Sequence, residues 1–166
     1  MGNPTTDLYR ELYRLLDTET PLRFDCGRLC GTACCQLSPD LPGMYLFPGE
    51  EALFAGLSDF NISQGHLPGF GEVPVLSCQG HCDREQRPLS CRVFPLAPQV
   101  RGGSISVRMD PRGRAVCPLC LQEAGSLSSG FRAAVRQVFG QLWQTADGKR
   151  FLTAISEQLE AFDEPL

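Results

Sequence analysis

The sequence predicts a small, loop-rich α+β domain with a helix at the N-terminus and a helical hairpin at the C-terminus. Apolar residues recur at helical spacing near both ends of the chain. Between them, short apolar or alternating runs are typical of strands, and many of the 17 glycines and 13 prolines interrupt these runs with turns. The chain has 166 residues, of which 42% are hydrophobic, so we expect one domain over residues 1–166.

The N-terminal part of the chain is expected to form a helix from Thr6 to about Leu16. Thr6 can cap this helix, and apolar residues follow it at intervals of three and four. Turn-forming residues predict a loop at 38–43, and residues 44–47 are typical of a short strand. An early proline and two glutamates then predict the first turn of a short helix at 48–51.

The remaining elements follow from the same patterns. Residues 61–72 contain three glycines and one proline and are expected to form a loop. Strands are expected at 73–77 and 104–108. Residues 131–143 and 151–162 have periods near 3.6, so they predict two helices separated at Asp147-Gly148, as a hairpin over residues 126–163.

The charge of the chain argues against nucleic acid and membranes as partners. The formal net charge is −4 and the isoelectric point is near 5.2, whereas a nucleic-acid surface or polybasic membrane anchor needs positive charge. No run of 18 or more apolar residues could span a bilayer, and the first 16 residues lack the apolar segment of a signal peptide. We therefore expect a soluble, cytoplasmic protein with reduced thiols.

Nine cysteines lie within a stretch of 95 residues, in the patterns C-x3-C-x3-C-C, C-x3-C-x8-C and C-x2-C. They are Cys26, Cys30, Cys34, Cys35, Cys78, Cys82, Cys91, Cys117 and Cys120. Short loops that return several sulfurs to one point suit a metal centre, because soft thiolates must meet within about 2.3 Å of a zinc ion. The pattern predicts cysteine-ligated metal, either an iron–sulfur cluster or zinc, in a core over residues 20–121. In this interpretation the metal substitutes for a missing apolar interior.

Adjacent cysteines restrict how the sulfurs can be shared. Neighbouring side chains of an extended backbone point to opposite sides, so Cys34 and Cys35 are not expected to bind the same tetrahedral zinc. One arrangement uses eight cysteines in two four-sulfur sites. Another uses four cysteines in one cluster and leaves the others structural or reactive.

Other interpretations of the cysteines are weaker. An odd number of cysteines and no export signal disfavour disulfide bonds. A thioredoxin-like role for Cys117 and Cys120 is disfavoured because no βαβ pattern precedes them. His66 and His81 could each replace a cysteine at zinc, His81 more readily because Cys82 follows it, although a lone histidine in a loop is more often solvated.

Seven arginines lie between Arg84 and Arg114. They form either a solvated face or a positive environment that keeps nearby thiols deprotonated. Arg87 and Arg92 are the candidate cofactor-binding residues among them. Arg92 follows Cys91 and could hydrogen-bond a cluster sulfide or bind an anionic substrate, while the alternative is that the Arg87-Pro88 segment and Arg92 only shape the turn that presents Cys91.

Three segments resemble those of a known family. Residues 24–35 carry the Phe24-Asp25-Cys26 to Cys34-Cys35 run, residues 44–51 form a hydrophobic strand followed by two glutamates, and residues 87–95 read Arg-Pro-Leu-Ser-Cys-Arg-Val-Phe-Pro. Together they resemble the YkgJ-like cysteine-cluster family, described as zinc- or iron-chelating, over roughly residues 24–120. The family pattern F-x-C-x2-C-x2-C-C has two-residue spacers, whereas both spacers here have three residues.

The resemblance implies metal binding by the seven cysteines from Cys26 to Cys91, with Cys117 and Cys120 as additions. The family is also similar to the cysteine-rich part of flagellin lysine N-methylases, where an iron–sulfur cluster is expected. The chain has no glycine motif for S-adenosylmethionine, so methylase activity is not carried over. Three functions stay open: a structural or electron-transferring metal centre, which could serve a protein partner; an enzyme that uses the metal or a free thiolate; and a thiol-rich redox or metal-handling protein.

Overall fold

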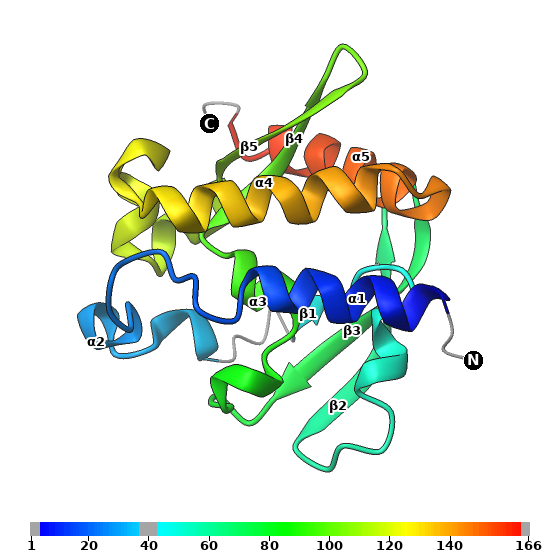
Figure 1. Cartoon of the computed structure of the whole chain (residues 1–166), viewed down its shortest axis with the longest axis horizontal. Coiled ribbons are helices and arrows are strands. Elements are labelled where there is room, and N and C mark those ends of the chain that lie inside the picture. The colour runs from blue at the N-terminus through cyan, green and yellow to red at the C-terminus, as the bar shows by residue number, and fades with distance from the viewer. Residues whose placement is uncertain (1–3, 37–42, 164–166) are drawn as a thin grey trace.

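The computed structural model describes residues 4–36 and 43–163, so most of the loop predicted at 38–43 lies outside the described residues. Long helices occur at both ends of the chain, and two small antiparallel sheets lie between them in sequence (Figure 1). This arrangement confirms the predicted α+β class with a helix at the N-terminus and two helices at the C-terminus.

Three long helices form one side of the fold. They are α1 (Pro4–Leu15), α4 (Ser129–Trp143) and α5 (Ala146–Glu160). Helix α1 lies alongside α4 (Figure 1), and the Gln141 side chain donates a hydrogen bond to Glu11 across them at 3.2 Å. The break in the hairpin falls earlier than the predicted Asp147-Gly148, because Thr145 caps α5 by accepting a hydrogen bond from the Gly148 amide at 3.0 Å.

A three-stranded antiparallel sheet contains β1 (Met44–Tyr45), β2 (Phe60–Leu67) and β3 (Gly71–Cys78), in the order β1-β3-β2. The loop predicted at 61–72 is wrong, because most of that segment is β2 and the start of β3. Strand β2 pairs along β3 from Phe60 opposite Cys78 to Leu67 opposite Gly71. Most side chains of β2 face solvent, so the strand lacks the alternation of apolar and polar residues that sequence prediction uses. Its hydrogen bonds to β3 define it as a strand.

The second sheet is the hairpin of β4 (Leu96–Arg101) and β5 (Ser104–Met109), which confirms the strand predicted at 104–108. Gly102 and Gly103 connect the strands with positive φ angles of 56° and 75°, as tight hairpin turns require. The hairpin packs against α5, where the Val100 amide donates a hydrogen bond to the Ser156 hydroxyl at 2.9 Å.

Short helical segments connect these elements. The α-helical ones are α2 (Gly27–Cys30) and α3 (Leu89–Val93), and the 3-10 segments are η1 (Ala33–Cys35), η2 (Glu50–Leu53), η3 (Arg84–Gln86), η4 (Pro111–Ala115), η5 (Pro118–Leu121) and η6 (Ala124–Ser126). The short helix predicted from residue 48 is therefore a single 3-10 turn. Every cysteine lies in one of these short segments, at the end of β3 or in an adjoining loop.

An extensive apolar core joins the long helices to both sheets. Phe47 lies near its centre, with ring centroids 6.4 Å from Phe139 and 5.2 Å from Phe151. Cys117 and Cys120 are buried within the core. The expectation that metal substitutes for a missing interior is therefore wrong, since buried side chains of this kind each contribute about 1.5–3 kcal/mol. No helix in the described ranges has both the length and the apolar character needed to cross a membrane.

Candidate metal centre

The first cysteine segment folds back on itself through two short helical turns. Cys26 precedes α2 and Cys30 ends it, and the chain then reverses through Gly31 and Thr32, whose φ angles of 60° and 58° are both left-handed. Thr32 is the only described non-glycine residue with a positive φ angle. The reversal is held by a hydrogen bond from the Thr32 amide to the Gly27 carbonyl at 3.0 Å.

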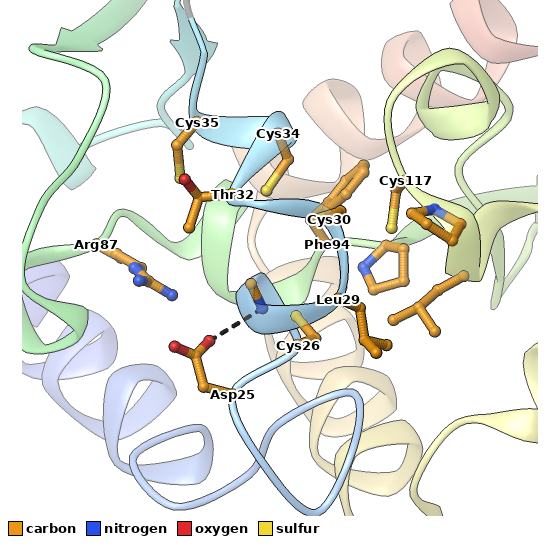
Figure 2. A pocket seen from close by; sticks show the side chains of 14 residues that line it. Asp25, Cys26, Leu29, Cys30, Thr32, Cys34, Cys35, Arg87, Phe94 and Cys117 are labelled. Carbon is orange, nitrogen blue, oxygen red and sulfur yellow. Dashed lines mark hydrogen bonds between the residues drawn. The ribbon is translucent and has the colours of Figure 1, made fainter.

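This reversal places five cysteines around one cavity of about 40 Å³, which is comparable with the ~30 Å³ that one water occupies in the liquid. Four come from the first segment, and the fifth, Cys117, comes from the loop before η5 (Figure 2). Phe94, Pro118 and Leu119 supply apolar walls. The cavity is therefore small, largely apolar and rich in sulfur.

The second cysteine segment approaches the first from the end of β3. Cys78 ends that strand, and the following loop turns at Gly80, where a Cβ atom would lie 3.6 Å from the Cys35 carbonyl oxygen. Cys82 follows in the same loop and Cys91 lies in α3. Segments separated by more than 40 residues are thus in contact at Cys35.

Electrostatic interactions among the thiols define two neighbourhoods. Cys26 interacts with Cys30 and Cys117, and Cys34 interacts most strongly with Cys35 and also with Cys30 and Cys26. Cys91 and Cys82 each interact with Cys35 and Cys78. We call Cys26, Cys30, Cys34 and Cys117 the first sulfur group, and Cys35, Cys78, Cys82 and Cys91 the second sulfur group.

The adjacent Cys34 and Cys35 lie at the boundary between the groups. Figure 2 shows Cys35 on the side of Arg87 and Cys34 on the side of Cys30. The two thiols nevertheless remain in hydrogen-bond contact with each other. The expectation that neighbouring side chains point to opposite sides assumed an extended backbone, whereas Cys34 and Cys35 lie in the 3-10 segment η1 and their thiols touch.

Cys120 touches the first sulfur group only at Cys117. It does not line the cysteine cavity, its thiol is hydrogen-bonded to Cys117, and a Cβ atom on Gly113 would collide with its sulfur. Burial, with Cys117 adding to the effect, raises the pKa of Cys120 to about 12. The Cys120 thiol is therefore protonated at neutral pH and packed in the core.

The protonation of the thiols depends on their surroundings. Burial raises the pKa of Cys26, Cys82 and Cys91, and neighbouring cysteines add to the rise. At Cys35 the hydrogen bond from the Cys34 thiol lowers the pKa to about 6, with Arg87 adding to the effect. Most of these sulfurs therefore need a nearby cation before they can be ionised together.

Arg87 supplies one such cation. Its guanidinium lines the cavity, hydrogen-bonds to Cys82 and interacts electrostatically with Cys35 and Cys26. Burial alone would lower the pKa of Arg87, but these cysteines raise it. Its Nε atom is buried and has no hydrogen-bond partner among the described residues. Arg87 therefore faces members of both sulfur groups.

Arg92, the other candidate cofactor-binding residue, points elsewhere. Its guanidinium donates hydrogen bonds to Asp17 at 3.1 Å and to the carbonyls of Arg87 and Glu85 at 3.1 and 2.8 Å, and it lies 4.6 Å from the centre of the Tyr13 ring. This placement agrees with the alternative that Arg92 shapes the turn presenting Cys91. Direct binding of a cofactor by Arg92 stays a prediction.

Glu50 is a buried residue beside the site that the sequence did not single out. Its carboxylate is fully buried and accepts hydrogen bonds from the Tyr13 hydroxyl at 2.6 Å and from the amides of Phe47 and Leu89 at 2.9 and 2.8 Å. The sequence predicted only that Glu50 and Glu51 lie in the first turn of a short helix. The burial of Glu50 could not be predicted because no local sequence pattern distinguishes Glu50 from Glu51.

The histidines lie in different places. His81 is exposed and interacts electrostatically with Cys35, so it lies near the second sulfur group. His66 pairs with Glu72 across the β2–β3 ladder, six residues along β3 from Cys78, or about 20 Å at the usual rise per residue. Of the two, only His81 is placed as a ligand candidate.

The chemistry of these residues suits a metal that prefers sulfur ligands, because nine thiols without disulfide partners and the Arg87 guanidinium lie in three neighbouring segments. Within the described ranges, no three cysteine, histidine or acidic side chains already meet in a geometry that could hold a metal ion. Side-chain rotations of the thiols would therefore accompany metal binding.

The chain was also compared with known proteins. No family model, curated protein or solved structure matches it, so the resemblance to the YkgJ-like family stays a prediction drawn from its motifs.

Proposed function

We propose that the protein binds metal through two four-thiolate centres, one at each sulfur group. The observation that carries the proposal is the division of Cys34 and Cys35: each belongs to a different set of thiols, and each set combines cysteines from separate segments. This is the two-site arrangement left open by the sequence. Either zinc or an iron–sulfur cluster is compatible with four thiolate ligands.

The surroundings support such centres. Four thiolates around a divalent ion leave a net charge of −2, and the nearby Arg87 reduces the free-energy cost of holding that charge in an apolar cavity. A bound centre would supply a cross-link between the cysteine segments, or an electron carrier if it contains iron and sulfide. The ninth thiol, Cys120, is left outside both sets.

Purification of the full chain under anaerobic conditions tests the proposal. Elemental analysis should find metal bound in a fixed ratio to protein. A brown protein with broad visible absorbance would identify iron–sulfur, and a colourless protein with two zinc ions per chain would identify zinc. A reduced protein that binds neither metal after reconstitution would contradict the proposal.

A second candidate function is thiol–disulfide exchange. Two pairs of thiols are already in hydrogen-bond contact, Cys34 with Cys35 and Cys117 with Cys120. Exchange with a disulfide-containing partner would oxidise one pair and reduce the partner, with two electrons and two protons transferred. Rapid reduction of a small disulfide by the metal-free protein, with no metal retained after anaerobic purification, would favour this alternative.

A further inference from the structure

A second depression in the surface lies on the opposite side of η5 from the cysteine cavity. It is an open groove of about 590 Å³ between the β4–β5 hairpin, the η4–η5 segment and Asp163, which follows α5. Three arginines line it: Arg101, Arg108 and Arg114. Figure 1 shows the end of α5 beside β5, where these segments come together.

The three arginines surround one carboxylate. Arg108 binds Asp163 through both guanidinium nitrogens, at 2.7 Å to Oδ1 and 2.5 Å to Oδ2. Arg114 lies 3.7 Å from Oδ1, and Arg101 interacts with Asp163 electrostatically. The hydrogen bond from Arg108 lowers the pKa of Asp163, and Arg114 and Arg101 add to the effect. The groove thus already holds one ionised carboxylate in the two-point geometry that guanidinium groups favour.

The single carboxylate of Asp163 does not neutralise the charge of all three arginines. The Arg101 side chain is exposed and makes no hydrogen bond or ion pair within 4 Å among the described residues, and the Arg114 side chain has only its longer contact with Asp163. Glu123 is the other acidic residue lining the groove. Among the described residues that line the groove, three are positively charged and two are negatively charged, and Asp110 and Glu160 also interact with Arg108 from outside the lining.

The rim of the groove adds an apolar contact. The Leu121 side chain is 73% exposed and lines the groove beside the polar side chains of Gln99 and Gln122. An ordered apolar side chain next to guanidinium groups suits a ligand with both aliphatic and anionic parts. Nucleic acid is disfavoured as that ligand by the net negative charge.

Segment η5 connects the groove to the cysteine site. Pro118 and Leu119 line the cysteine cavity, while Cys120 and Leu121 line the groove. A molecule held in the groove would therefore lie against the same short 3-10 turn that follows Cys117. This places the groove where a protein served by the cysteine site would dock.

We propose that this groove binds an acidic peptide segment of a partner protein through its carboxylates, and that Asp163 occupies the groove as an internal competitor. A partner carboxylate would displace Asp163 from Arg108 and would also reach Arg101. Recognition would be strongest where an aliphatic side chain next to the carboxylate packs on Leu121. The proposal concerns charge and shape on this face and does not depend on the metal content of the cysteine site.

Binding of a fluorescein-labelled hexaglutamate peptide, followed by fluorescence anisotropy at low salt, tests the proposal on the full chain. Asp163→Asn should bind the peptide about tenfold more tightly than the wild type, because the internal competitor loses its charge. Arg101→Gln should weaken binding to Asp163→Asn about tenfold when the two changes are combined. Since the Arg101 side chain makes no hydrogen bond or ion pair among the described residues, this change should leave the fold intact, which thermal unfolding would verify.

Matched controls separate this site from general charge attraction. Arg10→Gln removes an exposed arginine paired with Asp7 on α1 and should leave peptide binding unchanged. A hexaglutamine peptide should not bind. The proposal is overturned if Asp163→Asn binds no more tightly than wild type, if Arg10→Gln weakens binding as much as Arg101→Gln, or if hexaglutamine binds equally well.

Discussion

The backbone amide of Leu89 donates a hydrogen bond to the Glu50 carboxylate at 2.8 Å. Leu89 is the first residue of α3, so the carboxylate joins the turn after β1 to the helix that carries Cys91, the last cysteine of the second segment. The same carboxylate accepts from Tyr13 in α1. One buried acidic residue therefore connects the core to the helix that presents a candidate ligand.

Replacing Glu50 should destabilise the fold. In Glu50→Gln, one carboxylate oxygen becomes an amide that can only donate, so at least one of its three buried donor partners is left unsatisfied. We expect a loss of about 2–4 kcal/mol in the free energy of unfolding, measured with urea. Glu72→Gln, at an exposed position of β3, is the matched control and should change stability by less than about 0.5 kcal/mol. Equal stabilities for the two variants would contradict the role given to Glu50.

Arg87 should matter for metal affinity more than for folding. Arg87→Gln removes the positive charge beside Cys35 and Cys82 and keeps a side chain of similar reach. Residues that support metal ligands without binding the metal typically contribute about 10–100-fold to affinity, so a weakening in that range is expected in competition with a chromophoric chelator. Arg150→Gln, which removes an exposed arginine paired with Asp147, should bind metal like the wild type. An unchanged affinity in Arg87→Gln would show that Arg87 does not support the centre.

Gly113 should be intolerant of any side chain because Cys120 fills the space beside it. A Cβ atom there would collide with the Cys120 sulfur and lie 2.8 Å from Phe94 Cζ. Gly113→Ala should therefore cost about 1–3 kcal/mol in unfolding experiments, whereas Gly125→Ala, where no atom lies within 4 Å, should not destabilise by steric contact. Combining Gly113→Ala with Cys120→Ala should recover part of the loss, and full additivity of the two changes would argue against this contact.

Metal binding should weaken as the pH falls. The pKa values of Cys26, Cys82 and Cys91 are raised by burial, so these thiols hold protons in the metal-free protein at neutral pH and must release them to bind metal. Protons therefore compete with metal, and the apparent zinc affinity should rise from pH 6 to pH 8. Zinc titrations in two buffers of different ionisation enthalpy would measure the protons released. A pH-independent affinity without proton release would contradict thiolate ligation.

The long helices were predictable because their apolar residues repeat at helical intervals and face one core, as Leu12 and Leu16 do in the first helix. Strand β2 was not, since residues such as Asn61 and Ser63 face solvent and carry no apolar alternation. Its pairing with β3 depends on backbone hydrogen bonds that sequence patterns do not reveal.

The candidate site was predictable in composition but not in arrangement. The clustering of the cysteines in the sequence predicted that their segments share one site, whereas the contact between Cys34 and Cys35 within a 3-10 turn was not predicted. The separate position of Cys120 could not be foreseen, because it depends on a tertiary contact with Gly113. The side chains of Arg87 and Arg92 also point in different directions. The Arg92 guanidinium binds Asp17, which follows α1, and the sequence does not reveal this tertiary contact.

The most direct measurement is the metal content of three variants purified anaerobically beside the wild type. Cys26→Ser removes a ligand from the first sulfur group, Cys91→Ser removes one from the second, and Cys120→Ser changes the thiol outside both. The account predicts that each of the first two variants loses half of the bound metal and that Cys120→Ser retains all of it. Loss of all metal in both Cys26→Ser and Cys91→Ser, or loss in Cys120→Ser alone, would contradict two independent four-thiolate centres.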